Sequence, residues 1–365
     1  MHLKSITVDL GDRSYPILIG KGLLPHTGNY MEDLLTSRKA VILTVPGVEV
    51  MYSPAVRESL AKCGIASEVV RVPDREEAKT LATYTTVVKK LVAMNAGKDT
   101  LIVSLGGGCV GDLAGFVAAT YMRGIPIIHI PTTLLAQVDS SIGGKAAINL
   151  PEAKNLLGAF HQPSLVLSDI GTLATLPQRE MGSGISELIK YGAILDLDLL
   201  GFLEKERQLL LMINGEAVIH AISRAAELKA SIVSQDERES GDLRTLLNFG
   251  HTLGHAIESA MKYHGFSHGE AVGVGMVGET SLAVELDLAT RDELERLKAL
   301  IGSYGLPTSL RGVEPSLILE LMANDKKIRA GKWRFALPNG LGNGVVVSDP
   351  PREKVVSAIR GVVGY

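Results

Sequence analysis

The sequence has few aromatic residues: phenylalanine, tyrosine and tryptophan make up 4% of its 365 residues, with a single tryptophan. Apolar residues nevertheless reach 46%. The core must therefore be built from valine, isoleucine, leucine and alanine, as in parallel sheets covered by helices. A chain of this length exceeds what one hydrophobic core usually serves, so we expect two domains.

Cysteine, long apolar runs and excess charge are also scarce. Cys63 and Cys109 fit neither a disulfide framework nor a CxxC site, which is typical of a reducing compartment. No stretch approaches the roughly 18 apolar residues of a membrane helix, and residues 1–30 lack the apolar run of a signal peptide. The net charge is -3 and there is no long basic run. We therefore expect a cytoplasmic protein with no nucleic-acid and no membrane partner.

Apolar runs and helical periods alternate in the first half of the chain. This pattern predicts strands at 6–19 (two strands around a turn at 10–13), 40–45, 69–72, 100–105 and 125–130, with helices over 80–94 and 111–122. Such alternation is typical of a Rossmann-like α/β domain with a doubly wound parallel sheet. From about residue 175 helical periods dominate, over 217–235, 246–262, 269–288 and 291–304. We place an α/β domain at 1–173 and a mainly α-helical domain at 174–365.

Four of the nine histidines, at positions 251, 255, 264 and 268, fall within eighteen residues. On a helix His251 and His255 share a face, which suits two metal ligands or one ligand beside a catalytic base. A catalytic zinc usually takes three protein ligands, often imidazoles with one carboxylate. Glu187, one turn before Lys190, is the best candidate for that carboxylate. The alternative is a helix pair whose histidines cap carbonyls or face solvent.

Gly106, Gly107, Gly108 and Gly111 form a GxGxxG pattern directly after a predicted strand and at the start of a helix. In that context glycines let backbone N–H groups approach a pyrophosphate at a helix N-terminus. The turn follows a later strand than in the usual fingerprint, however, so a tight packing turn is the alternative. Asp112 suits a ribose hydroxyl or an amide better than a phosphate, or it is simply a charge in the first helical turn. Thr132 and Thr133 would supply hydroxyl groups beside the same crevice.

Basic side chains next to glycine-rich or turn-like segments form a further set. They are Arg123, Lys145, Lys154, Lys229, Arg244, Lys326 and Lys327. Each one alone is an ordinary solvated charge. Together they favour anion recognition if they converge on the metal. Because the metal residues belong to the helical half and the glycine turn to the sheet half, we expect the active site in the interdomain cleft.

Read together, these motifs resemble those of the 3-dehydroquinate synthases in the sugar-phosphate cyclase family. The resemblance spans nearly the whole chain. It is carried by Glu76-Glu-Ala-Lys79, 106–112, Thr120-Tyr-Met-Arg123-Gly, 131–145, Lys154-Asn155, Glu187-Leu-Ile-Lys190, 248–255, His268-Gly-Glu270 and Asp325-Lys-Lys327. Two departures, Ser186 before the metal glutamate and Asp74-Arg75, remove no chemical group.

The resemblance implies a cytoplasmic homodimer that uses NAD and zinc, with cobalt as a possible substitute. Its substrate would be the sugar phosphate 3-deoxy-D-arabino-heptulosonate 7-phosphate, converted to 3-dehydroquinate and phosphate in the shikimate route to chorismate and the aromatic amino acids. The steps would be transient oxidation by NAD, β-elimination of phosphate, re-reduction, ring opening and intramolecular aldol closure.

Motif matching also implies roles for individual residues. Glu187, His251 and His268 would bind the metal, although His264 is an alternative third ligand. The substrate and catalytic set would be Arg123, Asp139, Lys145, Lys154, Asn155, Lys190, Lys229, Arg244, Asn248 and His255, with Lys326 or Lys327. The NAD set would be Glu76, Lys79, Gly106, Gly107, Gly108, Asp112, Thr132, Thr133, Lys145, Lys154, Thr172, Thr175 and Leu176.

Three other functions fit parts of the sequence. A sister cyclase acting on another sugar phosphate would be expected to change several residues around the carboxylate and phosphate. A metal-dependent alcohol dehydrogenase of the glycerol dehydrogenase type would share the two-domain plan but would not need Lys145, Lys154 and Arg244, and it would release NADH. A former enzyme that now binds NAD or metal as a sensor would have lost some of these groups, which are all present.

Overall fold

The computed structural model describes residues 3–31, 39–261, 265–323 and 333–364. These residues form two compact units. Unit 1 comprises residues 1–176 and 218–234, and unit 2 comprises 177–217 and 235–365. Among the described helices, none has the length and apolarity that crossing a membrane requires.

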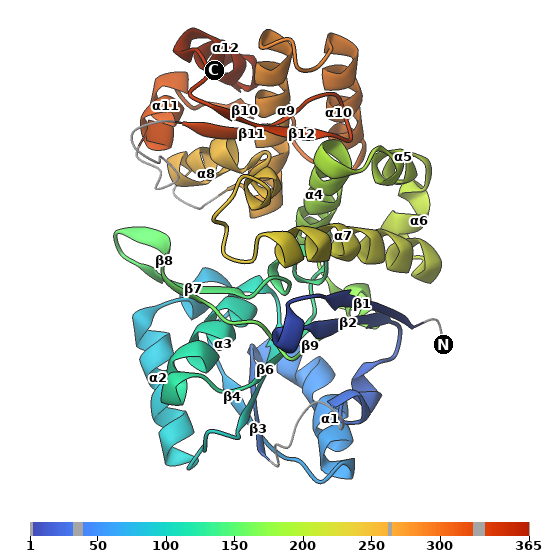
Figure 1. Ribbon diagram of the computed structural model, residues 1–365, viewed down its shortest axis with the longest axis vertical. Coiled ribbons are helices and arrows are strands. Elements are labelled where there is room, and N and C mark those ends of the chain that lie inside the picture. Colours follow the sequence, from blue (N-terminus) through green and yellow to red (C-terminus); the bar gives the residue numbers. More distant parts are fainter. Residues whose placement is uncertain (1–2, 32–38, 262–264, 324–332, 365) are drawn as a thin grey trace. The chain divides into compact units, whose positions relative to one another are not determined.

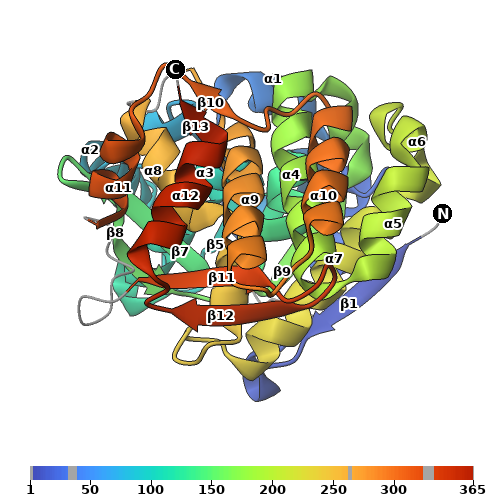
Figure 2. The ribbon, with the colours of Figure 1, turned by 90° about the horizontal axis from the view of Figure 1, so that it is seen from above.

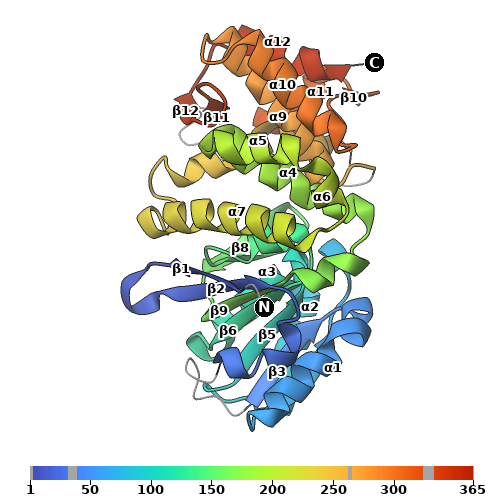
Figure 3. The same cartoon turned by 90° about the vertical axis from the view of Figure 1, so that its right-hand side faces the viewer.

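Unit 1 contains a seven-stranded sheet in the order β1-β2-β9-β6-β5-β3-β4, of which the strands from β1 to β3 are labelled in Figure 3. Its strands are β1 (Lys4–Val8), β2 (Tyr15–Gly20), β3 (Lys39–Thr44), β4 (Ala66–Arg71), β5 (Leu101–Gly106), β6 (Ile127–Pro131) and β9 (Leu165–Asp169). β1 and β2 pair antiparallel and the other neighbours pair parallel. The predicted parallel α/β sheet is therefore confirmed.

Helices cover both faces of this sheet because its strands are apolar on both sides. α1 (Pro46–Lys62) packs on one face, and α2 (Leu81–Ala93) and α3 (Gly108–Thr120) pack on the other (Figure 1). Successive residues of β3 go to opposite cores, Ile42 to the α1 side and Val41 and Leu43 to the α3 side. The carboxyl ends of β5, β6 and β9 lead directly into the segments that carry the predicted NAD residues.

Several elements of unit 1 differ from the sequence prediction. The helix α1, the central strand β9 and the hairpin of β7 (Lys145–Leu150) and β8 (Ala153–Phe160) were not predicted. α3 begins at Gly108, three residues before the predicted start, because the glycine turn itself enters the helix. Short 3-10 segments connect the strands at Gly11–Arg13, Leu24–His26, Asn29–Met31, Arg75–Ala78, Tyr121–Arg123 and Ile170–Thr175.

Unit 2 is mainly helical, as predicted. Its helices are α4 (Gln178–Leu195), α5 (Leu197–Lys205), α6 (Arg207–Leu211), α8 (His251–Ala260), α9 (His268–Glu285), α10 (Arg291–Ser303), α11 (Pro315–Ala323) and α12 (Arg352–Val362). Two small sheets pair β10 (Leu310–Arg311) with β13 (Val363–Gly364) and β11 (Arg334–Pro338) with β12 (Gly344–Ser348). α9 lies between α12 and α10 (Figure 2) and also packs on α4 and α8.

The units differ from the predicted domains mainly in α7 (Gly215–Gln235). Residues 218–234 of this helix group with unit 1, whereas the sequence division placed them in the second domain. One reason lies in its polar contacts: Lys229 bonds to Asp139, and Ser234 Oγ accepts the N–H of Asp9. The functional division, NAD at 1–173 and metal and substrate at 174–365, stays a prediction.

The predicted helix over 246–262 is wrong in its first part. Residues Arg244–Asn248 form a 3-10 turn, and α8 begins only at His251. Gly250 separates the two with a φ of 78°, in the left-handed region where glycine carries no steric penalty. His251 therefore stands at the first position of α8, and His255 follows one turn later.

Candidate active site

Three helices of unit 2 bring Glu187, His251 and His268 together. Glu187 lies in the middle of α4, His251 at the start of α8 and His268 at the start of α9. The distances from Glu187 Oε1 to His251 Nε2 and His268 Nε2 are 3.5 Å and 3.7 Å. Ligand atoms around a tetrahedral zinc, with bonds of about 2.0–2.1 Å, lie about 3.3 Å apart. The spacing of the three groups thus fits a metal ion.

The burial of Glu187 supports the same interpretation. Its side chain is about 1% exposed and neither carboxylate oxygen accepts a hydrogen bond from the described residues. Besides the two histidines, it pairs with Lys190, which is equally buried on the same helix. Burying a charge without hydrogen bonds costs several kcal/mol unless a cation compensates it. A divalent metal would supply that compensation.

Outer contacts orient both imidazoles. The Nδ1 of His251 lies 3.1 Å from the carbonyl oxygen of Phe249, and the Nδ1 of His268 lies 3.5 Å from Glu258 Oε2. Such partners fix the tautomer that presents Nε2 to a metal. Desolvation lowers the pKa of His268, but the carboxylates of Glu187 and Glu258 outweigh it and raise that pKa to about 10. A metal ion that binds here must displace this proton.

A second set of metal-ligating groups adjoins the first. His255, Glu258 and His268 also present ligand atoms within 4.8 Å of one another. His255 is thus near the metal group without belonging to it, which suits the proton-relay role expected of it. His264, the alternative third ligand, lies outside the described residues. The assignment of Glu187, His251 and His268 as metal ligands stays a prediction.

In unit 1 the glycine turn forms a close-packed cradle. Gly107 caps α3 after β5, and a Cβ on Gly107 would lie 3.0 Å from Thr133 Cγ2. A Cβ on Gly108 would lie 2.9 Å from Ser140 Oγ. Thr132 follows β6 and donates its N–H to the carbonyl of Gly106. The turn therefore leaves no room for side chains beside the backbone at the N-terminus of α3, as close approach of a pyrophosphate requires, and the residues present fit NAD.

Lys79 ties the predicted NAD residues to a predicted substrate residue. Its ammonium group lies 2.5 Å from Asp112 Oδ2 and 2.5 Å from Asn155 Oδ1. Although burial lowers the pKa of Lys79, the carboxylates of Asp112 and Glu76 raise it overall, so the amine stays charged. Glu76 in turn accepts from Asn149 and faces Lys154 at 3.8 Å. The charge of Asp112, beside the glycine turn, is thus paired with the cation of Lys79.

Asp139 and Lys229 also meet within unit 1. Asp139 lies in a π-helical turn, Ala136–Ser140, a form that is frequent at functional sites. Lys229 Nζ, from α7, donates to the Asp139 carbonyl at 2.7 Å and to its Oδ1 at 2.8 Å. Lys229 is 6% exposed. The pair is therefore rigidly placed, as substrate-binding groups should be.

Arg244 and Asn248 lie together in unit 2, before α8. Arg244 is 2% exposed and its guanidinium donates to the carbonyl of Glu237, while Asn248 donates to Glu239 Oε1 at 3.3 Å. The carboxylate of Asp236 holds this loop by accepting backbone N–H groups of Ser240, Gly241 and Arg244. Burial opposes ionisation of Asp236, but these N–H groups lower its pKa.

The remaining predicted residues lie in unit 1 or outside the described residues. Thr172 and Thr175 belong to the 3-10 segment after β9 and Leu176 follows it, while Lys145 begins β7 and Lys154 lies in β8. Arg123, directly before Gly124, has a left-handed backbone conformation with a φ of 65°. Lys326 and Lys327 lie outside the described residues. The predicted NAD residues thus lie in unit 1 and the predicted metal residues in unit 2, while the described residues of the predicted substrate set are divided between the two units. The roles stay predictions.

Sequence reasoning missed Gln137, which joins the ends of two strands. It is fully buried, and its Nε2 lies within 3.2 Å of the Pro131 carbonyl, the Asp169 carbonyl and Thr172 Oγ1. It therefore links the threonine turn after β6 to the 3-10 segment after β9. Sequence reasoning also missed Glu258, although a carboxylate one helical turn after His255 is a detectable signal.

Comparison with known proteins decides the family. The family model for the 3-dehydroquinate synthase N-terminal region matches residues 69–183, and that for the C-terminal region matches 184–328. The chain belongs to the 3-dehydroquinate synthase family. Among its relatives, the 3-dehydroquinate synthase of Desulforamulus reducens is 43% identical over 97% of this chain and 99% of its own.

Solved structures of other sugar-phosphate cyclases share the fold of this 3-dehydroquinate synthase family member. A 2-epi-5-epi-valiolone synthase from Streptomyces hygroscopicus, with NAD+ and Zn2+ bound, is 29% identical with a TM-score of 0.88, covering 97% of this chain and 98% of that one. A 2-deoxy-scyllo-inosose synthase complexed with carbaglucose-6-phosphate, NAD+ and Co2+ is 28% identical with a TM-score of 0.85, covering 98% and 100%.

Proposed function

We propose that this protein is a 3-dehydroquinate synthase that converts 3-deoxy-D-arabino-heptulosonate 7-phosphate to 3-dehydroquinate and phosphate. The observation that carries the proposal is the grouping of Glu187, His251 and His268 around a space of metal dimensions. It occurs in a chain that is 43% identical, over nearly its full length, to a 3-dehydroquinate synthase. The reaction is a carbon–oxygen lyase reaction on a phosphate ester, in the shikimate route.

We propose NAD and a divalent metal, zinc or cobalt, as cofactors. The two related cyclases hold NAD+ with Zn2+ or with Co2+. When bound, NAD would supply reversible hydride transfer and the metal would supply Lewis-acid polarisation of substrate oxygens. Gly107, Gly108, Asp112 and Lys79 would hold the nucleotide, and the metal would take Glu187, His251 and His268.

The residues around these groups have distinct tasks. His255 is proposed to relay protons at the substrate oxygen nearest the metal, because an imidazole titrates near neutrality. Lys190, pinned beside Glu187, would keep a positive charge at the metal-bound end of the substrate. Asp139 and Lys229 would orient its hydroxyls and the Arg244 loop its anionic groups. One product, inorganic phosphate, would leave from a cationic pocket. The main task of the surrounding residues would therefore be to hold and orient the phosphate group rather than to act as strong acids or bases.

The anionic groups of the substrate are assigned to basic side chains that the family resemblance names. Arg123 and Lys154, with Lys326 or Lys327, are proposed to face the phosphate or the carboxylate of the substrate, and Asn155 and Asn248 to bind its hydroxyls. On family resemblance we also propose a homodimer in the cytoplasm.

A sister cyclase is the second candidate, because the two solved structures above belong to that class. The higher identity to a 3-dehydroquinate synthase, 43% against 29%, and the presence of Arg123, Arg244 and Asn248 favour dehydroquinate formation.

The experiment is turnover of zinc-loaded protein with 3-deoxy-D-arabino-heptulosonate 7-phosphate and NAD, with phosphate, dehydroquinate and NADH followed in parallel. The expected result is equal phosphate and dehydroquinate with no accumulation of NADH, abolished by Glu187→Ala. Steady accumulation of NADH on a polyol would instead indicate a dehydrogenase. Turnover of another sugar phosphate alone would indicate a sister cyclase.

A further inference from the structure

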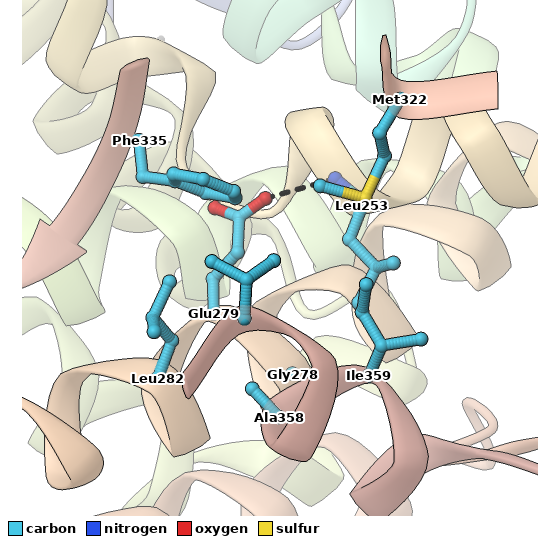
Figure 4. A pocket seen from close by; sticks show the side chains of 9 residues that line it. Leu253, Gly278, Glu279, Leu282, Met322, Phe335, Ala358 and Ile359 are labelled. Carbon is cyan, nitrogen blue, oxygen red and sulfur yellow. Dashed lines mark hydrogen bonds between the residues drawn. The ribbon is translucent and has the colours of Figure 1, made fainter. Parts of the chain in front are cut away.

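We infer that Glu279 is a positioning residue for the metal ligand His251, although it contacts no predicted ligand atom. The inference deepens the proposed function and rests on its metal centre. Glu279 lies in the second half of α9, three turns after His268, and its side chain is 1% exposed. It lines a small cavity whose other walls are mostly apolar (Figure 4): Leu253, Leu282, Met322, Phe335, Val355, Ala358 and Ile359. A carboxyl group at such a place needs a structural or functional reason.

The contacts of Glu279 bracket His251. One carboxyl oxygen accepts the N–H of Gly250 at 2.6 Å, and the other accepts the N–H of Leu253 at 3.0 Å. These donors belong to the residue before His251 and to the residue two after it. Both are among the backbone N–H groups that a helix start leaves without partners inside the helix. Glu279 therefore fixes the backbone on each side of the ligand.

The same face of α9 connects Glu279 to the other histidine ligand. His268, Val272, Gly275 and Glu279 follow one another at spacings of four, three and four, so they form one stripe along the helix. Where this stripe crosses α8 the backbones touch: a Cβ on Gly275 would lie 2.0 Å from the carbonyl oxygen of Gly250. α9 thus carries a ligand at one end and the anchor of the second ligand's backbone at the other.

The consequence for the metal is geometric. Gly250 has a left-handed φ of 78°, a conformation in which small changes redirect the first residue of α8. His251 Nδ1 also bonds to the carbonyl of Phe249, in the same turn. If the Gly250 N–H loses its acceptor, both the start of α8 and the tilt of the His251 ring change relative to Glu187. A metal site tolerates little such displacement.

The test compares Glu279→Gln with Thr280→Val in metal-free full-length protein. The amide of Glu279→Gln keeps the shape but can accept only through one oxygen, so one of the two N–H groups faces an NH2 group. Thr280 is the matched control because it is buried in the same helix and its hydroxyl donates to the carbonyl of Met276, one turn earlier in that helix. Thr280→Val therefore removes a buried hydrogen bond within α9 and leaves the two hydrogen bonds of Glu279 to α8 in place.

Zinc affinity is measured by competition with a chromophoric chelator, at a temperature where both variants give the circular dichroism of the folded protein. The visible spectrum of bound cobalt reports ligand geometry, and NAD affinity serves as a control for unit 1. We expect Glu279→Gln to weaken zinc binding about 10- to 100-fold, the usual cost of losing an outer-shell partner, and to change the cobalt spectrum. Thr280→Val should leave both unchanged, and NAD binding should be the same in both.

Equal zinc affinity and equal cobalt spectra for the two variants would overturn the inference while leaving the metal centre intact. If a Glu187→Gln variant bound zinc as tightly as the wild-type protein does, the metal centre and the inference would both be overturned. If Glu279→Gln does not fold, Glu279→Asp replaces it. That variant keeps the carboxyl group but is one methylene too short to reach both donors, and the same two outcomes apply.

Discussion

Acid should destabilise unit 1 through His129. This residue lies in β6 opposite Ser104 of β5, on the face that α3 covers, and it is 7% exposed. Its Nδ1 has no hydrogen-bond partner among the described residues. Burial, with a smaller contribution from nearby His161, lowers the pKa of His129 from 6.5 to about 4. The folded protein therefore holds this imidazole neutral.

The direction in which stability changes with pH follows from proton binding. Between the two pKa values the unfolded chain binds a proton that the folded chain does not, so stability is complete above 6.5 and is lost as pH falls toward 4. One pKa unit corresponds to about 1.4 kcal/mol, so the full loss is about 3 kcal/mol and the loss by about pH 5 is about 2 kcal/mol.

The assay is urea unfolding followed by circular dichroism at about pH 7.5 and about pH 5, on wild type and on His129→Gln. Glutamine stays uncharged throughout, so the variant should lose about 2 kcal/mol less than wild type over this interval. Other titrating groups affect both proteins equally and cancel in the comparison. Parallel pH dependence in the two proteins would refute the reasoning, because His129 would then not be held neutral by the fold.

Three further predictions concern the two candidate sites. Glu187→Gln should raise the dissociation constant for zinc at least about 100-fold, measured by chelator competition, because it removes the only predicted anionic ligand; unchanged affinity would exclude Glu187 as a ligand. Lys79→Met should weaken NAD binding at least about tenfold in a fluorescence titration, since Asp112 loses its counter-cation; wild-type affinity would place the nucleotide elsewhere. Gly275→Ala should cost about 1–3 kcal/mol or more of stability, because its Cβ meets the Gly250 carbonyl; an unchanged melting temperature would contradict this close approach.

Every strand of the sheet except β9 was predictable, because these strands carry the pattern in their own sequence. Continuous apolar runs such as 40–45 and 100–105 have few alternatives to a strand buried on both faces. The helix α1 was not predictable, because its apolar residues do not recur along one face of a helix. Ser53 and Ser59 are buried while Val50 and Met51 are exposed. Tertiary packing, rather than local periodicity, sets this helix.

The clustering of the histidines was predictable from their spacing in the sequence. His251 and His255 are four apart, and α8 places them on one face, with ring centroids 5.4 Å apart. The supporting carboxyl groups were not predictable in the same way. Glu279 bonds to backbone N–H groups, which every residue has, so nothing in the sequence marks its partner. Only the crossing of α8 and α9 reveals it.

The start of α8 is a helix boundary that the sequence pattern did not predict. The periodicity over 246–262 suggested one helix, but Gly250 breaks it in left-handed backbone. Glycine within a helical pattern signals such a break only weakly. The break matters because it places His251 at the first position of α8, where its backbone depends on partners from outside the helix.

The most direct test of the central claim follows the hydrogen at C5 of the substrate. Zinc-loaded protein with NAD is given 3-deoxy-D-arabino-heptulosonate 7-phosphate deuterated at C5, and the dehydroquinate, phosphate and NADH are analysed. A redox-neutral cyclase predicts equal phosphate and dehydroquinate, with the deuterium retained at that carbon and no net NADH. Deuterium in free NADH, or its loss to solvent, would contradict the account.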